Sequence, residues 1–260
     1  METPSLLESY LKQLGLPAVI QHYRRLAEEA TRSQASYEQF LCAVVEQEIR
    51  KREQQRLQRL IRNARFPVVK ELADFQFAAI PSLNQQQILD LAQSRSIVAA
   101  ESVVLIGNPG LGKTHIASGL ALAACKQGYR VRFYSAAGLV NDLLHAQADH
   151  RVNRFITQAL KYQLIVVDEL GFIPFSTLGA QLIFQFCSSV YARVALLVTS
   201  NLRFADWTQV FGDERLTAAL LDRLTHKAHI LEFVGESHRL RQRSQHERRV
   251  EVPGVTAPMT

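Results

Sequence analysis

The chain has 260 residues, of which 47% are hydrophobic and 21% are charged, so it can bury one sizeable α/β domain and a smaller appendage. No apolar run approaches the roughly 18 residues of a membrane span, and Met1–Gly15 lacks a signal-peptide pattern. The three cysteines lie far apart in apolar helical contexts, which argues against a disulfide framework or a zinc site. We therefore expect a cytoplasmic protein that does not engage a membrane.

The net charge of +6 is unevenly distributed along the chain. Residues 1–65 carry 11 Lys and Arg against 8 Asp and Glu, and residues 238–260 carry 5 against 2. The stretch between them carries 14 residues of each sign and is neutral. This distribution favours a polyanionic partner that contacts the two ends of the chain.

Residues 1–65 show helical periodicity and no strand pattern. A first helix has apolar residues from Leu6 to Leu14 and ends at Gly15. A second is predicted from about Pro17 to Ala30, and a third from about Ser36, whose hydroxyl can cap it, to Arg62. We assign these residues to a small all-helical domain that binds DNA or a partner.

The third helix carries a stripe of arginines. Between residues 50 and 65, seven basic residues accompany a single acid, Glu53. The stripe runs from Arg52 to Arg62, with arginines four, three and three residues apart that share one side of the helix. Leucine and isoleucine occupy another side. A cationic stripe suits contacts with DNA phosphates, although a solvated helix face has the same pattern. The predicted DNA contacts are Arg50, Arg52, Arg56, Arg59 and Arg62.

The stretch after this helix is predicted to be a connection. Phe66-Pro67 breaks the helix, and Lys70–Ile80 is predicted to be a linker ahead of a helix over Asn84–Ser94. Phe75 and Phe77 in this linker either line an adenine pocket or make ordinary core contacts. The pattern alone does not decide between these two interpretations.

A glycine-rich loop is the clearest motif in the chain. An apolar strand pattern over 102–106 leads into the spacing G-x-x-x-x-G-K-T, and a helical pattern follows. The glycines let backbone N–H groups face a phosphate, and the helix N-terminus adds positive charge. We expect Lys113 to reach the outer phosphates and the Thr114 hydroxyl to bind Mg²⁺. The predicted nucleotide-binding residues are Gly107, Asn108, Pro109, Gly110, Leu111, Gly112, Lys113, Thr114 and His115.

Beyond the loop, strands and helices alternate, as in a doubly wound parallel sheet. Four aliphatic residues precede Asp168 and Glu169, which lie at the strand end where open sheets bind ligands. We expect Asp168 to bind the nucleotide's Mg²⁺ and Glu169 to polarise the water that attacks the γ-phosphate. Asn201, after the next buried strand, either orients that water or is an ordinary turn residue. The other predicted strands are 130–135, 194–200 and 228–233, and the predicted helices are 137–144, 152–160, 177–193 and 213–224.

These segments together resemble the AAA+ ATPases, and more closely the IstB-type transposition helper ATPases of bacterial insertion elements. That family is related to the replicative helicase loaders. The resemblance implies an α/β P-loop sheet in the order 5-1-4-3-2, no C-terminal lid domain, and ATP hydrolysis with Mg²⁺ in oligomers bridged by ATP. The matching runs are 80–84, 168–172, 199–202, 211–217 and 221–224.

The resemblance also assigns roles to three residues beyond the loop and the acids. Asn201 matches a sensor of the γ-phosphate, and Arg239 matches a second, sensor-like arginine that contacts the nucleotide. Arg223 matches an arginine finger that reaches the nucleotide of a neighbouring subunit. From the residues alone, Arg223 would equally pair with Asp222 or Asp213 on its own helix.

The expected domains are 1–65 for the helical domain, 66–240 for the ATPase domain and 241–260 for a basic tail. The resemblance implies a regulator that oligomerises on duplex DNA without reading its sequence, bends it, and recruits a transposase. ATP hydrolysis would then drive disassembly. The alternative is a replicative helicase loader, which would bind single strands and a helicase. A small-molecule kinase is disfavoured, because the sequence shows no substrate-binding lid.

Overall fold

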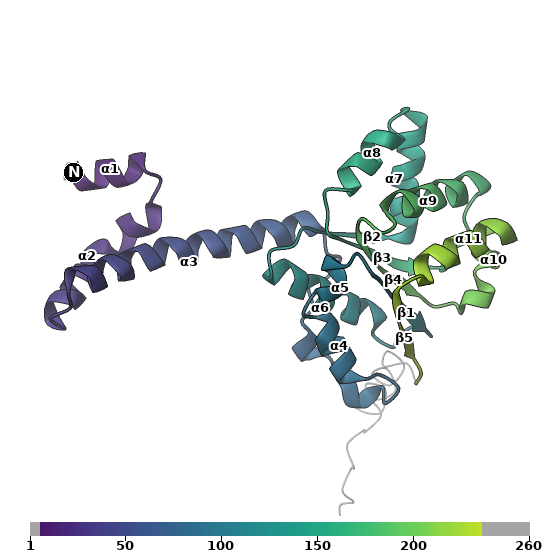
Figure 1. Ribbon diagram of the computed structural model, residues 1–260, viewed down its shortest axis with the longest axis horizontal. Coiled ribbons are helices and arrows are strands. Elements are labelled where there is room, and N and C mark those ends of the chain that lie inside the picture. Colours follow the sequence, from purple (N-terminus) through teal and green to yellow (C-terminus); the bar gives the residue numbers. More distant parts are fainter. Residues whose placement is uncertain (1–5, 236–260) are drawn as a thin grey trace, which may run out of the picture. The chain divides into compact units, whose positions relative to one another are not determined.

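The computed structural model describes residues 6–235 and divides the chain into two compact units at the boundary between Arg59 and Leu60 (Figure 1). The first unit is helical and has a small apolar core of its own. The second unit is an α/β domain with a larger core. Among residues 6–235, none of the helices combines the length and the apolarity that are needed to cross a bilayer.

The N-terminal unit consists of packed helices, as predicted. Helix α1 spans Leu6–Gln13, α2 spans Pro17–Arg32, and α3 spans Tyr37–Ala64 and so continues past the boundary between the units. The helices begin and end within a few residues of the predicted positions. The buried core residues are Leu11, Val19, Leu26 and Val44.

The start of α3 is fixed by a reciprocal pair of side-chain caps. The Ser36 hydroxyl accepts a hydrogen bond from the N–H of Gln39 at 3.2 Å, and the Gln39 side-chain oxygen accepts one from the N–H of Ser36 at 2.8 Å. Both donors would otherwise lack a partner in the first turn of the helix. The predicted cap at Ser36 is therefore confirmed.

A buried carboxylate on α3 caps the neighbouring helix α2, which has no side-chain cap of its own. Glu48 is 5% exposed, and its Oε2 accepts a hydrogen bond from the N–H of Ala18 at 2.9 Å. Its Oε1 accepts one from Nε of Arg52 at 2.9 Å, and Arg52 also donates to the carbonyl oxygen of Gly15 at 2.9 Å. Glu48 and Arg52 therefore clamp the turn between α1 and α2 onto α3.

The second unit contains a five-stranded parallel sheet in the order β2-β3-β4-β1-β5. This is the expected order 5-1-4-3-2 taken from the opposite edge, so the predicted AAA+ sheet is confirmed. The strands are β1 Ser102–Gly107, β2 Val131–Ser135, β3 Leu164–Leu170, β4 Ala195–Ser200 and β5 Ala228–Phe233.

Helices cover both faces of this sheet. In Figure 1, α7 to α11 gather on one side of it, and α4 to α6 lie on the other. The helices are α4 Gln85–Leu91, α5 Arg95–Val98, α6 Lys113–Lys126, α7 Ala136–Ala148, α8 Val152–Ala159, α9 Thr177–Val190, α10 Thr208–Phe211 and α11 Glu214–Thr225. Three short 3₁₀ turns are η1 Leu72–Asp74, η2 Phe77–Ala79 and η3 Phe204–Asp206.

The central strands are buried on both faces, which explains their continuous aliphatic runs. Ile165 and Val167 of β3 belong to the core that α7 and α9 complete. Val166 lies between them and is also fully buried, on the opposite face, where α6 packs against the sheet. Strands of this kind show no alternation of polar and apolar residues, because neither face meets water.

One predicted helix is divided into two. The helix predicted over 84–94 begins as expected, because the Asn84 side chain caps it by accepting a hydrogen bond from the N–H of Gln87. It ends at Leu91, and Ser94 has a left-handed φ of +62° before α5 begins. A right-handed helix cannot continue through such a residue, so the single predicted helix was wrong.

The segment after β4 is held by the only tryptophan of the chain. Trp207 is 1% exposed, and its ring lies 5.5 Å from that of Phe204 and 6.0 Å from that of Phe211. Its indole N–H donates to the carbonyl oxygen of Leu202 at 3.4 Å. Leu202 follows Asn201, so this aromatic cluster fixes the chain directly after the end of β4.

Candidate active site

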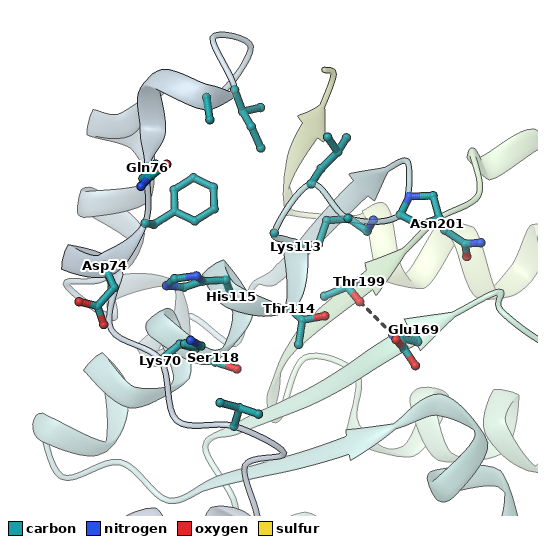
Figure 2. Close-up of a pocket in the computed structure, with 18 of the residues that line it drawn as sticks. Lys70, Asp74, Gln76, Lys113, Thr114, His115, Ser118, Glu169, Thr199 and Asn201 are labelled. Carbon is teal, nitrogen blue, oxygen red and sulfur yellow. Dashed lines mark hydrogen bonds between the residues drawn. The ribbon is translucent and has the colours of Figure 1, made fainter. Parts of the chain in front are cut away.

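The glycine-rich loop joins β1 to α6 and brings positive charge to one place (Figure 2). Gly112 immediately precedes α6 and has a left-handed φ of +83°. Lys113 is 9% exposed, and its ammonium group donates to the carbonyl oxygens of Gly107 at 2.6 Å and Asn108 at 2.9 Å. The lysine and the first N–H groups of α6 therefore lie together at the loop, as a phosphate site requires.

Asp168 lies beneath the loop at the end of β3 and is 5% exposed. Its carboxylate accepts hydrogen bonds from two hydroxyl groups. Oγ1 of Thr114 lies 3.0 Å from each carboxylate oxygen, and Oγ1 of Thr199 lies 2.5 Å from Oδ1. Hydroxyl and carboxylate oxygens are the ligands that Mg²⁺ prefers, so Thr114 and Asp168 fit a magnesium ion that also binds nucleotide phosphates.

An irregularity in β3 sets the direction of Glu169. In a regular strand, Asp168 and Glu169 would point to opposite faces of the sheet. The pairing of β3 with β4 is regular up to Val167 and resumes at Leu170 with one extra residue on β3. Glu169 has a φ of +62°, a conformation that costs a residue other than glycine about 1–3 kcal/mol. With this bulge, Glu169 lines the same cavity as the loop.

The cavity has a volume of about 630 Å³, which is typical of a site for a small molecule. Figure 2 shows side chains from the loop and from the ends of β3 and β4 around it. The amide oxygen of Asn201 is buried and has no hydrogen-bond partner within residues 6–235. A buried acceptor of this kind fits a site where a ligand or its water supplies the missing donor.

The predicted linker forms a wall of this cavity. We call residues 68–80 the strap. A Cβ atom on Gly112 would lie 2.6 Å from the Phe75 ring, and one on Gly119 would lie 2.5 Å from Leu72. Both distances are too short for a Cβ contact, so these two glycines allow the strap to lie directly on the loop and on α6.

Polar groups hold the strap at the same place. Nε2 of His115 lies 2.8 Å from the carbonyl oxygen of Glu71, and the Glu71 carboxylate pairs with Lys126 at 2.9 Å. Phe75 lines the cavity and Phe77 packs edge-on behind it, with ring centroids 4.9 Å apart. Most of this wall was not predicted from the sequence, and neither were two lining residues outside the strap, Ser118 and Phe172. The strap residues that were missed are Val68, Lys70, Asp74, Gln76, Ala79 and Ile80.

The comparison with protein families decides the identity of the chain. The profile of the family described as IstB-like ATP binding protein matches residues 9–246. The chain belongs to this family. Its expected membership is confirmed, and with it the expectation that the chain binds ATP.

Two curated relatives of this IstB-like protein come from insertion sequences. A protein of Pseudomonas aeruginosa, named for insertion sequence IS21 and for ATP binding, is 34% identical over 91% of this chain and 89% of its own. One of Geobacillus stearothermophilus, named for IS5376 and for ATP binding, is 32% identical over 93% of this chain and 96% of its own.

Solved structures are similar to the IstB-like chain in fold. The crystal structure of DnaI has a TM-score of 0.53 and 17% identity, covering 64% of this chain and 91% of that one. AMPPCP-bound DnaA from Aquifex aeolicus has a TM-score of 0.53 and 15% identity, covering 74% of this chain and 58% of that one. These likenesses concern the AAA+ fold alone.

In the IstB-like chain, Arg223 lies on α11 and is not among the described residues that line the cavity. Its guanidinium donates to the carbonyl oxygen of Ala219 at 3.1 Å and lies 4.7 Å from the centre of the Phe184 ring. The alternative pairing with Asp222 or Asp213 is not formed among residues 6–235. The arginine is therefore placed by an aromatic ring and its own helix.

Arg239 lies outside the described residues. The last described residue, Gly235, is close to the cavity, because a Cβ atom there would lie 3.9 Å from Leu111 and from the carbonyl oxygen of Ala79. Both Leu111 and Ala79 line the cavity. The role expected of Arg239 stays a prediction.

Two of the five predicted DNA contacts are engaged within the N-terminal unit. Arg50 pairs with Glu46 at 3.0 Å, and Arg52 pairs with the buried Glu48 at 2.9 Å. The prediction from residues 50–65 considered only Glu53, whereas the acids that pair with these arginines, Glu46 and Glu48, lie one turn earlier. The spacing of four residues on a helix was the signal that would have found them.

The other three arginines have different surroundings. Arg56, Arg59 and Arg62 are exposed and form no ion pair within residues 6–235. Arg56 and Arg59 belong to the N-terminal unit, whereas Arg62 belongs to the second. Their guanidinium groups are accessible to an external anion.

Proposed function

We propose that this IstB-like protein hydrolyses ATP with Mg²⁺ in the cavity at the loop. The observation that carries the proposal is the convergence of a loop lysine, a hydroxyl–carboxylate pair and a second carboxylate on one cavity. Lys113 and Thr114 lie where the loop enters α6, and the two carboxylates lie at the end of β3, where open parallel sheets bind ligands. Lys113, Thr114 and Glu169 line the cavity, and Asp168 accepts hydrogen bonds from the Thr114 hydroxyl at its edge.

Each group has a distinct task in this proposal. Bound ATP with Mg²⁺ supplies the reactive γ-phosphoryl group and neutralises part of the phosphate charge. Lys113 and the loop N–H groups bind the phosphates, while Thr114 and Asp168 hold the metal ion. The carboxylate of Glu169 accepts a proton from the attacking water, and the amide of Asn201 orients that water.

Two variants separate binding from hydrolysis. Lys113→Ala removes the cation from the loop and should abolish ATP binding. Glu169→Gln keeps the shape of the side chain but cannot accept a proton, so it should bind ATP and hydrolyse it about 10²–10⁴-fold more slowly. Binding of a fluorescent ATP analogue and release of phosphate are the measurements. Wild-type hydrolysis by Glu169→Gln would remove Glu169 from its proposed role.

We propose that the ATP-bound protein assembles on duplex DNA without reading its sequence. The excess positive charge at the chain ends and the accessible guanidinium groups of Arg56 and Arg59 support phosphate contacts. Arg62 is a third candidate, in the other unit. Arg50 and Arg52 are weaker candidates, because they already pair with Glu46 and Glu48.

The final parts of the proposal concern assembly and the partner. Arg223 would complete the site of a neighbouring copy, which gives the assembly an ATP-bridged interface. The two relatives named for insertion sequences support a transposase as the partner that the assembly recruits. Hydrolysis would then release the protein from DNA.

Preference for duplex or for single-stranded DNA distinguishes this function from helicase loading, the alternative prediction from the sequence. Electron microscopy and filter binding with duplex and with single-stranded DNA, each with a non-hydrolysable ATP analogue, provide the test. The transposition helper should form ordered assemblies on duplex of any sequence. Assembly on single strands alone would favour the loader.

A further inference from the structure

Thr199 occupies a position between the two acids of the site. This residue is 1% exposed, and it is the residue of β4 that lies opposite the extra residue in β3. Its hydroxyl donates to Oδ1 of Asp168 at 2.5 Å and accepts the backbone N–H of Glu169 at 2.9 Å. Figure 2 shows the second of these bonds inside the cavity wall.

The bond to Glu169 replaces a bond that the sheet does not provide. Regular pairing between β3 and β4 is interrupted between Val167 and Leu170, where the backbone N–H of Glu169 turns to the Thr199 hydroxyl. Glu169 has a left-handed φ there, which side chains other than glycine rarely adopt. Strained backbones of this kind persist where neighbouring groups fix them.

We propose that Thr199 is a positioning residue for ATP hydrolysis, because one hydroxyl holds the Glu169 backbone and the Asp168 carboxylate in a fixed relation. The inference rests on the proposed hydrolysis at this cavity. Thr199 lies two residues before Asn201, and both residues line the cavity with Glu169. The nucleotide phosphates are held mainly by the loop, so Thr199 affects turnover more than binding.

Isosteric substitution isolates the hydroxyl. Thr199→Val keeps the shape and removes both hydrogen bonds, so turnover should fall about 10–100-fold, part of what a positioned base contributes. Affinity for the ATP analogue should stay within about threefold, which corresponds to less than 1 kcal/mol. Thr199→Ser keeps the hydroxyl and should restore most of the rate. A structural role alone would not separate turnover from affinity or give this rescue.

A buried threonine elsewhere in the same unit provides the matched control. Thr217 on α11 is 3% exposed, and its hydroxyl donates to the carbonyl oxygen of Asp213 at 2.6 Å. Thr217→Val removes a buried hydroxyl of the same kind and should keep the wild-type turnover. If Thr199→Val does not fold, the pair Thr199→Ala and Thr199→Ser gives the same contrast between a lost and a retained hydroxyl.

The outcomes separate this inference from the proposed function. If wild type hydrolyses ATP, Glu169→Gln does not, and Thr199→Val keeps the wild-type rate, the positioning role is wrong while the proposed function stands. If Thr199→Val loses affinity and rate in equal proportion, Thr199 acts in binding and the inference is also overturned. If wild type does not hydrolyse ATP, the proposed function fails, and the inference fails with it.

Discussion

Each unit of the molecule buries one carboxylate at a junction of elements, and the two differ in their partners. Glu48 in the N-terminal unit accepts hydrogen bonds from the N–H of Ala18 and from the Arg52 guanidinium. Asp168 in the second unit accepts its hydrogen bonds from the neutral hydroxyls of Thr114 and Thr199. Both residues are 5% exposed.

The difference shows which buried acid is structural. The charge of Glu48 is balanced inside its own unit by Arg52. We call this pair the clamp, because it holds the turn between α1 and α2 on α3. Asp168 forms no ion pair within residues 6–235, and burial of a carboxylate with only neutral partners is costly. That cost is offset when a cation binds, so the neutral hydrogen-bond donors of Asp168 support the proposed Mg²⁺ site. In the proposed function, Mg²⁺ provides this positive charge at Asp168, and Arg223 of a neighbouring copy provides positive charge at the phosphates.

The largest expected effect concerns the cation from the neighbouring copy. Arg223→Ala should reduce turnover about 10³–10⁵-fold, because an arginine finger stabilises charge on the transferred phosphoryl group. Mixing Arg223→Ala with Lys113→Ala should recover ATPase activity at interfaces that pair an intact loop with an intact arginine. Arg215→Ala, an exposed position on the same helix, is the control and should keep the wild-type rate. No recovery in confirmed mixed assemblies would show that Arg223 acts within its own chain.

Neutral isosteres should affect the two buried acids in opposite directions. Glu48→Gln weakens hydrogen bonds to a charged group and should lower the unfolding free energy by about 1–2 kcal/mol. Asp168→Asn removes a buried charge without a cationic partner, so stability without Mg²⁺ should stay unchanged or rise by about 1 kcal/mol. Urea denaturation of the full chain measures both. Equal losses in the two variants would contradict the distinction between clamp and binding site.

The predicted site came largely from local sequence, and the reasons are physical. The loop spacing fixes its own geometry, and the ends of parallel strands meet at one edge, so Lys113, Asp168 and Glu169 were expected to share a cavity. The strap was expected to be a linker whose Phe75 and Phe77 either line an adenine pocket or make core contacts. The pattern did not decide between these, because the place of the strap depends on packing of Leu72 and Phe75 against glycines far along the chain. Such contacts leave no local pattern.

The role of Thr199 was missed for a similar reason. A strand ending in Thr-Ser-Asn gives no sign that the neighbouring strand holds an extra residue, and only that bulge makes Thr199 a shared partner of both acids. The arginines of α3 were predicted only in part. Their periodicity was correct, but acids one turn earlier decide which of them are engaged.

Acid should weaken the clamp selectively. Burial alone would raise the pKa of Glu48, but the N–H of Ala18, the Arg52 guanidinium and the N–H of Val19 outweigh it and hold the pKa below its ordinary value of 4.5. A lowered pKa means that the stabilisation is complete above the unfolded-state pKa and is lost as pH falls through the folded-state value. The stability gap between wild type and Glu48→Gln should therefore be constant from pH 7 to pH 5 and shrink below about pH 4. A difference in unfolding free energy that grows as the pH falls would contradict this prediction.

The smallest expected effects distinguish arginines on the same helix. Replacing Arg56 and Arg59 with Ala should reduce the slope of log affinity for duplex DNA against log salt by about 0.9 per lost contact, with stability unchanged. Arg52→Ala should leave that slope near the wild-type value and destabilise the N-terminal unit by about 1–2 kcal/mol, because Glu48 loses its cation. A slope that responds to Arg52 alone would assign the DNA contact to the clamp.

Trp207 gives the protein an intrinsic optical reporter. Its indole is the only one in the sequence, so tryptophan emission of the whole chain arises from one buried ring next to the end of β4. The hydrogen bond to the carbonyl oxygen of Leu202 ties that ring to the residue after Asn201. Stopped-flow fluorescence on the unlabelled protein can therefore follow the tip of β4 during a single turnover. The wavelength of its emission would record when water reaches this aromatic cluster, without a dye attached near the cavity.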